Sequence, residues 1–304
     1  MRADFASQLL PLTVWNMLNR RTFIRRSALG GAFLLTPGWM RSLQAGSLKN
    51  LVILHTNDIH SHLDPFPAND PKFPNQGGLA RIATLVKQVR AAEANVILLD
   101  SGDIFQGTPY FNRFGGKSEY ELMSSMGYVA STPGNHDFDN GIDGLTNMLP
   151  YAKFQMLNAN YRFDNTALAG KIKPSAVVAV NDIKVGLLGV GIELEGLVPP
   201  QLCKNVVYTD PVAAANREAE VLKKEHGCDV VICLSHLGYR YDDQKVDDRK
   251  LAAASRNIDV ILGGHTHTFL PAPEVITNAE GKEVVVNQAG WGGLRLGRIN
   301  LAIR

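Results

Sequence analysis

The sequence contains only three cysteines, Cys203, Cys228 and Cys233, in 304 residues. This number is odd and too small for a disulfide framework, and no CxxC pair indicates zinc or redox chemistry. Cys228 and Cys233 flank a run typical of a strand, and they would point to opposite faces if the whole stretch were extended. We therefore expect three free thiols, most of them buried.

The sequence also lacks an apolar run long enough to span a bilayer. The modest run over residues 27–35 is followed by Pro37-Gly38 and is both too short and too rich in glycine. Directly before it, residues 19–25 read NRRTFIR, which resembles a twin-arginine export signal. We therefore predict a removable leader that directs the protein to the periplasm by the twin-arginine route.

The leader is predicted to cover residues 1–45, with cleavage after Ala45, and the mature domain residues 46–304. Leu43 is a poor match to the small residue expected two positions before Ala45. A start at Met17 would give a more typical leader, in which case the residues before Met17 are not translated. The mature chain has no internal repeat and no linker segment, so we expect a single domain.

Charge of neither sign dominates the chain, whose formal net charge is +2. Residues 1–45 hold six arginines against one aspartate, a net of +5, which leaves about −3 for the mature chain. Bulk charge therefore gives no basis for nucleic-acid binding. No Gly-x-Ser-x-Gly elbow is present, and Gly189-Val190-Gly191 lacks the third glycine of a dinucleotide-binding motif.

Short apolar runs alternate with helical patterns along the mature chain, which predicts an α/β fold. Runs of four or so apolar residues without alternation are typical of strands buried on both faces. Apolar residues at helical spacing predict helices over residues 79–89 and 213–222, and prolines predict an irregular insertion over 64–78. The predicted strands are residues 51–54, 96–99, 185–188, 230–233 and 260–262.

Short polar clusters follow these runs, at the carboxyl ends where open α/β sheets place their sites. They supply carboxylate, amide and imidazole groups, the mixture that a pair of hydrolytic metal ions requires. Five of the eight histidines lie in them. One such residue alone is usually a cap or a turn residue, but independent capping does not produce the whole set. The clusters are Asp58-Ile59-His60, Gly102-Asp103, Gly134-Asn135-His136-Asp137, Ser235-His236 and Gly263-Gly264-His265-Thr266-His267.

In this order, the motifs NDIH, GDIFQGTP, GNHDFD, SHLG and GGHTH resemble the catalytic domain of the 5′-nucleotidase branch of the calcineurin-like metallophosphoesterases. The resemblance extends from about Leu51 to the end of the chain. It implies a four-layer α/β/β/α sandwich and two divalent metal ions, with Mn, Zn, Fe and Co all compatible with such ligands. It also implies phosphoester hydrolysis, in which a metal-bridging hydroxide attacks phosphorus in line.

The same resemblance implies a role for each matching residue. One metal would be held by Asp58, His60 and His267, the other by Asn135, His236 and His265, with Asp103 bridging them; His136 would assist the leaving group and Asp139 would orient His136.

Backbone geometry supplies physical reasons for some of these roles. In an extended backbone, the alternation in Asp58-Ile59-His60 would point both ligands to one side, and His265-Thr266-His267 would repeat this. Gly102 would let the chain turn sharply beside Asp103.

The family usually continues beyond a strand like residues 296–301 into a second domain that binds the nucleoside, whereas this chain ends at Arg304. We therefore expect a phosphorylated small molecule as substrate, with nucleotides among the candidates, and an open site. The alternatives are a catalytic subunit whose nucleotide-binding domain is a separate polypeptide, a sulfur-ester hydrolase of the same fold, and a metal-binding protein without catalysis.

Overall fold

The computed structural model describes residues 48–303. The predicted leader and its cleavage site lie outside these residues. Within residues 48–303, no helix is both long and apolar enough to cross a membrane.

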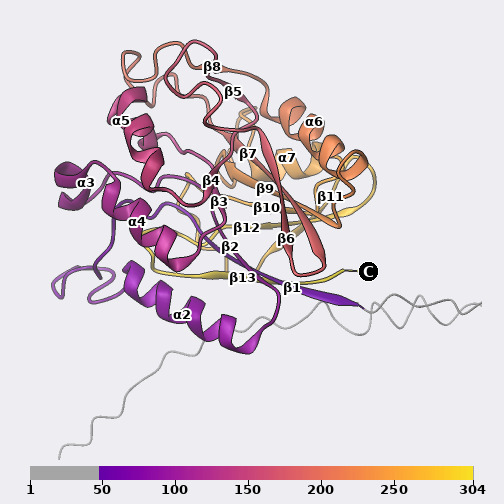
Figure 1. Ribbon diagram of the computed structural model, residues 1–304, viewed down its shortest axis with the longest axis horizontal. Coiled ribbons are helices and arrows are strands. Elements are labelled where there is room, and N and C mark those ends of the chain that lie inside the picture. Colours follow the sequence, from indigo (N-terminus) through magenta and orange to yellow (C-terminus); the bar gives the residue numbers. More distant parts are fainter. Residues whose placement is uncertain (1–47, 304) are drawn as a thin grey trace, which may run out of the picture. The chain divides into compact units, whose positions relative to one another are not determined.

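Two main sheets form the centre of the described chain (Figure 1). The first has the strand order β13-β1-β2-β3-β4. In it, β1 pairs parallel with β2 and antiparallel with β13, and β3 continues the parallel set. The strands are β1 (Lys49–Thr56), β2 (Val96–Asp100), β3 (Ala130–Ser131), β4 (Gln155–Met156) and β13 (Gly297–Ile303).

The second sheet has six strands in the order β11-β12-β10-β9-β7-β6, and its centre, β12-β10-β9-β7, is parallel. A small ribbon pairs β5 (Tyr161–Arg162) with β8 (Val207–Tyr208). The six strands are β6 (Ser175–Val180), β7 (Ile183–Gly191), β9 (Val230–His236), β10 (Val260–Leu262), β11 (Glu274–Thr277) and β12 (Glu283–Asn287).

Helices cover the outer face of each sheet (Figure 1). The first sheet carries α2, α4 and α5, and the second carries α6 and α7. The helices are α2 (Leu79–Ala92), α3 (Pro109–Phe114), α4 (Lys117–Met126), α5 (Gly141–Met148), α6 (Pro211–Lys224) and α7 (Asp248–Ala254), with 3₁₀ turns η1 (His136–Phe138) and η2 (Leu149–Tyr151).

Three apolar cores define the layers. One joins the two sheets, with Ile53 and Leu99 packed among residues such as Leu187 and Ile232. The other two lie between a sheet and its helices: Leu54 packs with α2 and α4, and Cys233 packs with α6 and α7. The layers are therefore helices, sheet, sheet and helices, which is the predicted α/β/β/α sandwich. In this arrangement each sheet buries both of its faces.

The local predictions are confirmed where the apolar pattern is strong. All five predicted strands lie within β1, β2, β7, β9 and β10, and the predicted helices are α2 and α6. Residues 64–78 contain no helix or strand. Cys203, Cys228 and Cys233 are free, and the last two are buried.

Candidate metal centre

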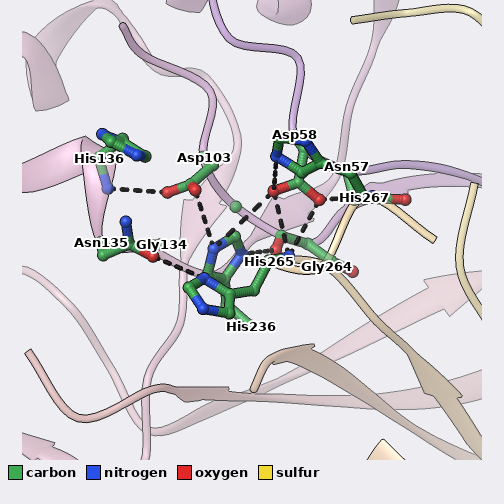
Figure 2. A network of polar contacts seen from close by, with 12 residues as sticks. Asn57, Asp58, Asp103, Gly134, Asn135, His136, His236, Gly264, His265 and His267 are labelled. Atoms are coloured by element: carbon green, nitrogen blue, oxygen red, sulfur yellow. Dashed lines mark hydrogen bonds and ion pairs between the residues drawn. The ribbon is translucent and has the colours of Figure 1, made fainter. Parts of the chain in front are cut away.

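All seven predicted metal ligands meet at one edge of the two sheets, at the carboxyl ends of parallel strands. The parallel pairing of β1 with β2 and of β9 with β10 brings these ends side by side. Figure 2 shows most of these side chains converging. Asp58 and His60 follow β1, Asp103 follows β2, Asn135 follows β3, His236 ends β9, and His265 and His267 follow β10.

The first group of candidate ligands is Asp58, His60 and His267, whose donor atoms lie within 4.8 Å of one another. The Nε2 atoms of the two imidazoles are 2.9 Å apart. Asp58 Oδ1 lies 3.8 Å from Nε2 of His60 and 3.4 Å from Nε2 of His267. Asp58 is fully buried, whereas the His267 side chain is 39 % exposed, so this group has a solvent-facing side.

The second group is Asp103, His236 and His265, whose donor atoms also lie within 4.8 Å of one another. Asn135 joins it through its Oδ1, which accepts a 2.8 Å hydrogen bond from Nδ1 of His265. Asp103 Oδ2 lies 3.1 Å from Nε2 of His236 and 3.9 Å from Nε2 of His60. The Asp103 carboxylate therefore lies between the two groups, as its predicted bridging role requires.

Five of the seven ligands have a left-handed rather than an extended backbone, and the prediction of strand-like alternation in residues 58–60 and 265–267 is wrong. Asp58, His60, Asp103, His265 and His267 all have positive φ, between 49° and 73°. This left-handed conformation is sparsely populated by residues with a Cβ and costs free energy. Consecutive tight turns, rather than the pleat of a strand, point these side chains to one side. Strain of this kind typically gathers at functional sites.

Gly102 has the predicted role in the turn before Asp103. Its φ is +87°, and a Cβ at this position would lie 2.7 Å from Thr132 O and from Gly134 N. Both the left-handed conformation and the close approach of the neighbouring loop therefore require glycine.

Hydrogen bonds fix several ligand side chains in place. Nδ1 of His236 donates to Ser101 O at 2.6 Å, since a carbonyl can only accept, and this leaves Nε2 facing Asp103. The Asp58 carboxylate accepts from Asn57 Nδ2 at 2.6 Å and from the His265 amide at 3.0 Å. The ligands are therefore held largely in place by the protein itself.

Burial and neighbouring carboxylates shift the pKa values of the histidines in this cluster in opposite directions. Burial alone would lower the pKa of His236, but the Asp103 carboxylate outweighs it and raises that pKa to about 10. Burial lowers the pKa of His265 to about 4 and also lowers the pKa of His60. The buried Asp103 carboxylate therefore favours a positive charge beside it, which a bound cation would supply.

The donor set fits divalent first-row metals. Imidazole nitrogens and carboxylate oxygens from both sheets face one another here, and the buried Nε2 of His236 lies 3.1 Å from Asp103 Oδ2. Imidazole, carboxylate and amide oxygen together suit Mn²⁺, Fe²⁺, Co²⁺ or Zn²⁺. The two groups therefore form a candidate dinuclear centre.

His136 lies beside the ligands and points into the open side of the site. Its ring centroid is 5.3 Å from that of His60, and its side chain is 36 % exposed. Nδ1 of His136 lies 3.0 Å from Asp139 Oδ2, and this hydrogen bond raises the pKa of His136. The predicted pairing of His136 with Asp139 is thus present, with the free nitrogen turned away from Asp139.

Sequence reasoning gave no role to three residues that support the site. Asn57 holds Asp58 and also accepts from the Ala289 amide at 2.8 Å. Asp137 is buried and accepts from the amides of Asp103, Ile104, Phe105 and Gly134. Trp291 stacks on His267. Asn57 and Asp137 lie inside the motifs NDIH and GNHDFD, whereas Trp291 lies in none of the motifs. The roles of all three follow only from their hydrogen bonds and packing.

His55 and His62, which neighbour the first cluster, are not ligands in either group. His55 is buried on β1 and its Nε2 lies 2.9 Å from Asn287 Nδ2. His62 Nδ1 donates to His60 O at 2.9 Å and its ring stacks on Phe66. His62 therefore supports the loop that carries a ligand.

Fold and site together define a metallohydrolase-type centre at the carboxyl edge of an α/β/β/α sandwich. A family model described as calcineurin-like phosphoesterase matches residues 51–269, and the chain belongs to this family. The predicted family and fold are thereby confirmed.

Several of the similar proteins are named as nucleotidases. Human 5′-nucleotidase is 36 % identical over 273 residues, covering 83 % of this chain and 46 % of that protein. A solved 5′-nucleotidase precursor from Thermus thermophilus has a TM-score of 0.73 and 32 % identity over 84 % of this chain and 54 % of its own. Haemophilus influenzae NAD nucleotidase has a TM-score of 0.72 and 28 % identity, and the match covers 84 % of this chain and 53 % of that protein. The chain thus spans about half the length of these relatives.

Proposed function

We propose that this protein hydrolyses phosphate esters with two divalent cations. The observation that carries the proposal is the Asp103 carboxylate, which lies between two convergent ligand groups and is within 3.1 Å of one imidazole and 3.9 Å of another. A carboxylate in this place can join two cations about 3.5–4 Å apart, the spacing of two-metal hydrolases.

Each group of residues has a distinct part in the proposed reaction. Asp58, His60 and His267 would hold one cation, and Asn135, His236 and His265 the other. When bound, the cations would supply Lewis-acid activation of water and of the phosphoryl oxygens. The neutral amide of Asn135 adds a ligand without a charge that would repel an anionic substrate.

His136 would bind the phosphoryl group or donate a proton to the leaving oxygen. Its half-exposed ring is held by Asp139, whose hydrogen bond raises the pKa of His136 and so keeps the imidazole protonated to higher pH. General acid catalysis of this kind contributes on the order of 10²–10⁴-fold. This pair also favours catalysis over metal binding alone, because a purely binding site has no use for it.

The test is hydrolysis by the purified protein, stripped of metal and reloaded with Mn²⁺ or Zn²⁺. The substrates are p-nitrophenyl phosphate, bis-p-nitrophenyl phosphate and a set of nucleoside monophosphates. Asp103→Asn should abolish turnover and weaken the binding of both cations. His136→Asn should lower turnover by about 10²–10⁴-fold with both cations still bound; loss of metal from His136→Asn would contradict this division of roles.

The outcomes separate the proposal from its alternatives. Metal-dependent turnover of the simple esters supports a phosphoesterase. Two bound cations without turnover of any phosphate ester would contradict it and favour a sulfur-ester hydrolase or a metal-binding protein.

A nucleotide is the first substrate class to test, because human 5′-nucleotidase and Haemophilus influenzae NAD nucleotidase are named for nucleotides. Turnover of simple esters with little selectivity among nucleotides would favour specificity from a separate partner polypeptide. Addition of such a nucleotide-binding domain should then lower KM for nucleotides and leave p-nitrophenyl phosphate unaffected.

Export is also proposed, on the NRRTFIR segment at residues 19–25. Replacement of both Arg20 and Arg21 by lysine should retain the protein in the cytoplasm, whereas lysine at Arg41 should not. Fractionation of cells that express each variant tests this, and periplasmic recovery of the double variant would contradict it.

A further inference from the structure

Trp291 covers the ring of His267, the most solvent-facing ligand of the first group. The two rings are stacked, with centroids 5.4 Å apart and planes at 11°. The His267 side chain is 39 % exposed, compared with 7 % for His60 and none for Asp58. A ligand so placed has fewer packing neighbours to fix its ring than the buried ligands have.

Among residues 48–303, no protein group accepts a hydrogen bond from Nδ1 of His267, one of the predicted metal-binding histidines. Such residues almost always donate their second ring N–H to a carbonyl, a carboxylate or water. Nδ1 of His236 does so, to Ser101 O at 2.6 Å. Among the hydrogen bonds within residues 48–303, the only one to the His267 ring joins its Nε2 to Nε2 of His60. The stacked face of Trp291 is therefore a protein contact that can orient this ring where no protein hydrogen bond does.

Trp291 is itself held on several sides. Its ring lies edge-on to the rings of His62 and Phe66, with centroids 5.2 Å away in each case, and the centroid of the Phe73 ring is 6.5 Å away. The next residue, Gly292, donates its amide to Asp58 O at 2.8 Å, which ties the Trp291 turn to the ligand loop. An indole fixed in this way can impose its orientation on the ring that stacks against it.

We propose that Trp291 is a positioning residue, which sets the orientation of His267 and thereby the affinity of the Asp58–His60–His267 group for its cation. This inference rests on the proposed function, in which this group holds one of the two cations. Loss of outer partners of metal ligands typically costs 10–100-fold in metal affinity, and we expect the same range here.

The stack also makes Trp291 a reporter mainly for the first group. The chain has three tryptophans, and Trp15 and Trp39 lie in the predicted leader. A paramagnetic cation such as Mn²⁺ at His267 would lie within a few ångströms of the indole, and it should quench the fluorescence of Trp291. Binding at the second group should quench it far less.

The experiment is a titration of the metal-free full chain with Mn²⁺, followed by tryptophan fluorescence and by the metal retained per chain. Trp291→Leu removes the flat ring, Trp291→Phe keeps a ring, and Trp39→Phe is the control. We expect quenching in the unmodified chain and in Trp39→Phe, and its loss in both Trp291 variants. Trp291→Leu should lower the affinity for one of the two cations by about 10–100-fold and leave the affinity for the other unchanged. The affinities of Trp291→Phe should stay within about threefold of those of the unmodified chain.

Thermal unfolding of each metal-free variant verifies that it is folded. Two cations bound to Trp291→Leu with unmodified affinities would overturn the positioning role and leave the proposed function standing. Equal weakening of both cations would also overturn it, because the effect would then not be specific to the first group. No cation bound by the unmodified chain would overturn the proposed function and this inference together.

Discussion

At the scale of single residues, the motifs predict which side chains meet but not how the backbone presents them. Spacing in Asp58-Ile59-His60 suggested an extended backbone, yet both ligands have positive φ, as does Asp103. Such conformations depend on close packing of neighbouring loops, for example the approach of Thr132 O to Gly102. Local sequence carries little information about that packing, which joins loops far apart along the chain.

One prediction at this scale concerns the pair His136 and Asp139. The hydrogen bond from Asp139 raises the pKa of His136, so Asp139→Asn should lower it. If protonated His136 assists the leaving group, turnover falls as pH rises through this pKa, and the variant should lose activity at lower pH than the unmodified enzyme. The pH dependence of kcat measures this shift.

The control for this shift is Asp143→Asn, which alters an exposed carboxylate on α5. It should keep the unmodified pH profile. If kcat of Asp139→Asn fell at the same alkaline pH as kcat of the unmodified enzyme, the proposed effect of Asp139 on the pKa of His136 would be contradicted.

At the scale of elements, the strongest patterns predicted four of the strands that carry the site, β1, β2, β9 and β10, but not the two-residue β3. Runs such as Val230-Val231-Ile232-Cys233 are buried throughout in the structure, and the polar residues come where these strands end. The helices α3, α4 and α5 were not predicted. They are short, and in α4 the buried positions include Glu119, so no clean apolar stripe marks them.

Asp137 connects two of these elements, the turns that follow β2 and β3. Its carboxylate accepts from Asp103 N at 3.1 Å, Ile104 N at 3.1 Å and Gly134 N at 2.8 Å. Asp137→Ala would leave these buried amides without partners and should lower the free energy of unfolding by about 3 kcal/mol. It should also weaken metal binding, because Asp103 lies on one of the turns.

Urea unfolding of the metal-free proteins measures this loss. The control is Asp164→Ala, at an exposed position, which should change stability by less than about 0.5 kcal/mol. Equal stability of the unmodified chain and Asp137→Ala would show that these hydrogen bonds do not hold the turns together.

At the scale of the whole molecule, apolar runs predicted an α/β chain but could not assign strands to two separate sheets. The four-layer arrangement came from the family resemblance. The reason is physical: runs buried on both faces look alike whether helices or a second sheet cover them. In the structure β1 and β9 belong to different sheets, although their sequences follow the same pattern.

Buried carboxyl groups predict how global stability depends on pH. Burial raises the pKa of Asp100 from 3.8 to about 7, so the folded protein holds this proton more tightly than the unfolded chain. The stabilisation is complete below pH 3.8 and is lost as pH rises to about 7. At about 1.36 kcal/mol per unit, the loss amounts to about 4 kcal/mol.

Asp100→Asn keeps the shape of the side chain and removes the titration. The free energy of unfolding of the metal-free variant should therefore fall less between about pH 4 and pH 8 than that of the unmodified protein. Parallel pH profiles for the two proteins would contradict the assignment to Asp100.

Metal binding should stabilise the whole domain, because both ligand groups join loops from the two sheets. At a free Mn²⁺ concentration about one hundred times the Kd, each site adds about 2.7 kcal/mol. Thermal unfolding with and without Mn²⁺ should show a rise in Tm of several degrees. His136→Asn should show the same rise and Asp103→Asn little or none; equal rises in both variants would contradict the ligand assignment.

The most direct test of the two-cation account is turnover of p-nitrophenyl phosphate as Mn²⁺ is added stepwise to the metal-free protein, with the metal bound per chain measured at each step. If Asp103 joins two cations that act together, turnover should stay low through the first equivalent and rise with the second. Full turnover with one equivalent, or in the presence of excess chelator, would contradict the account.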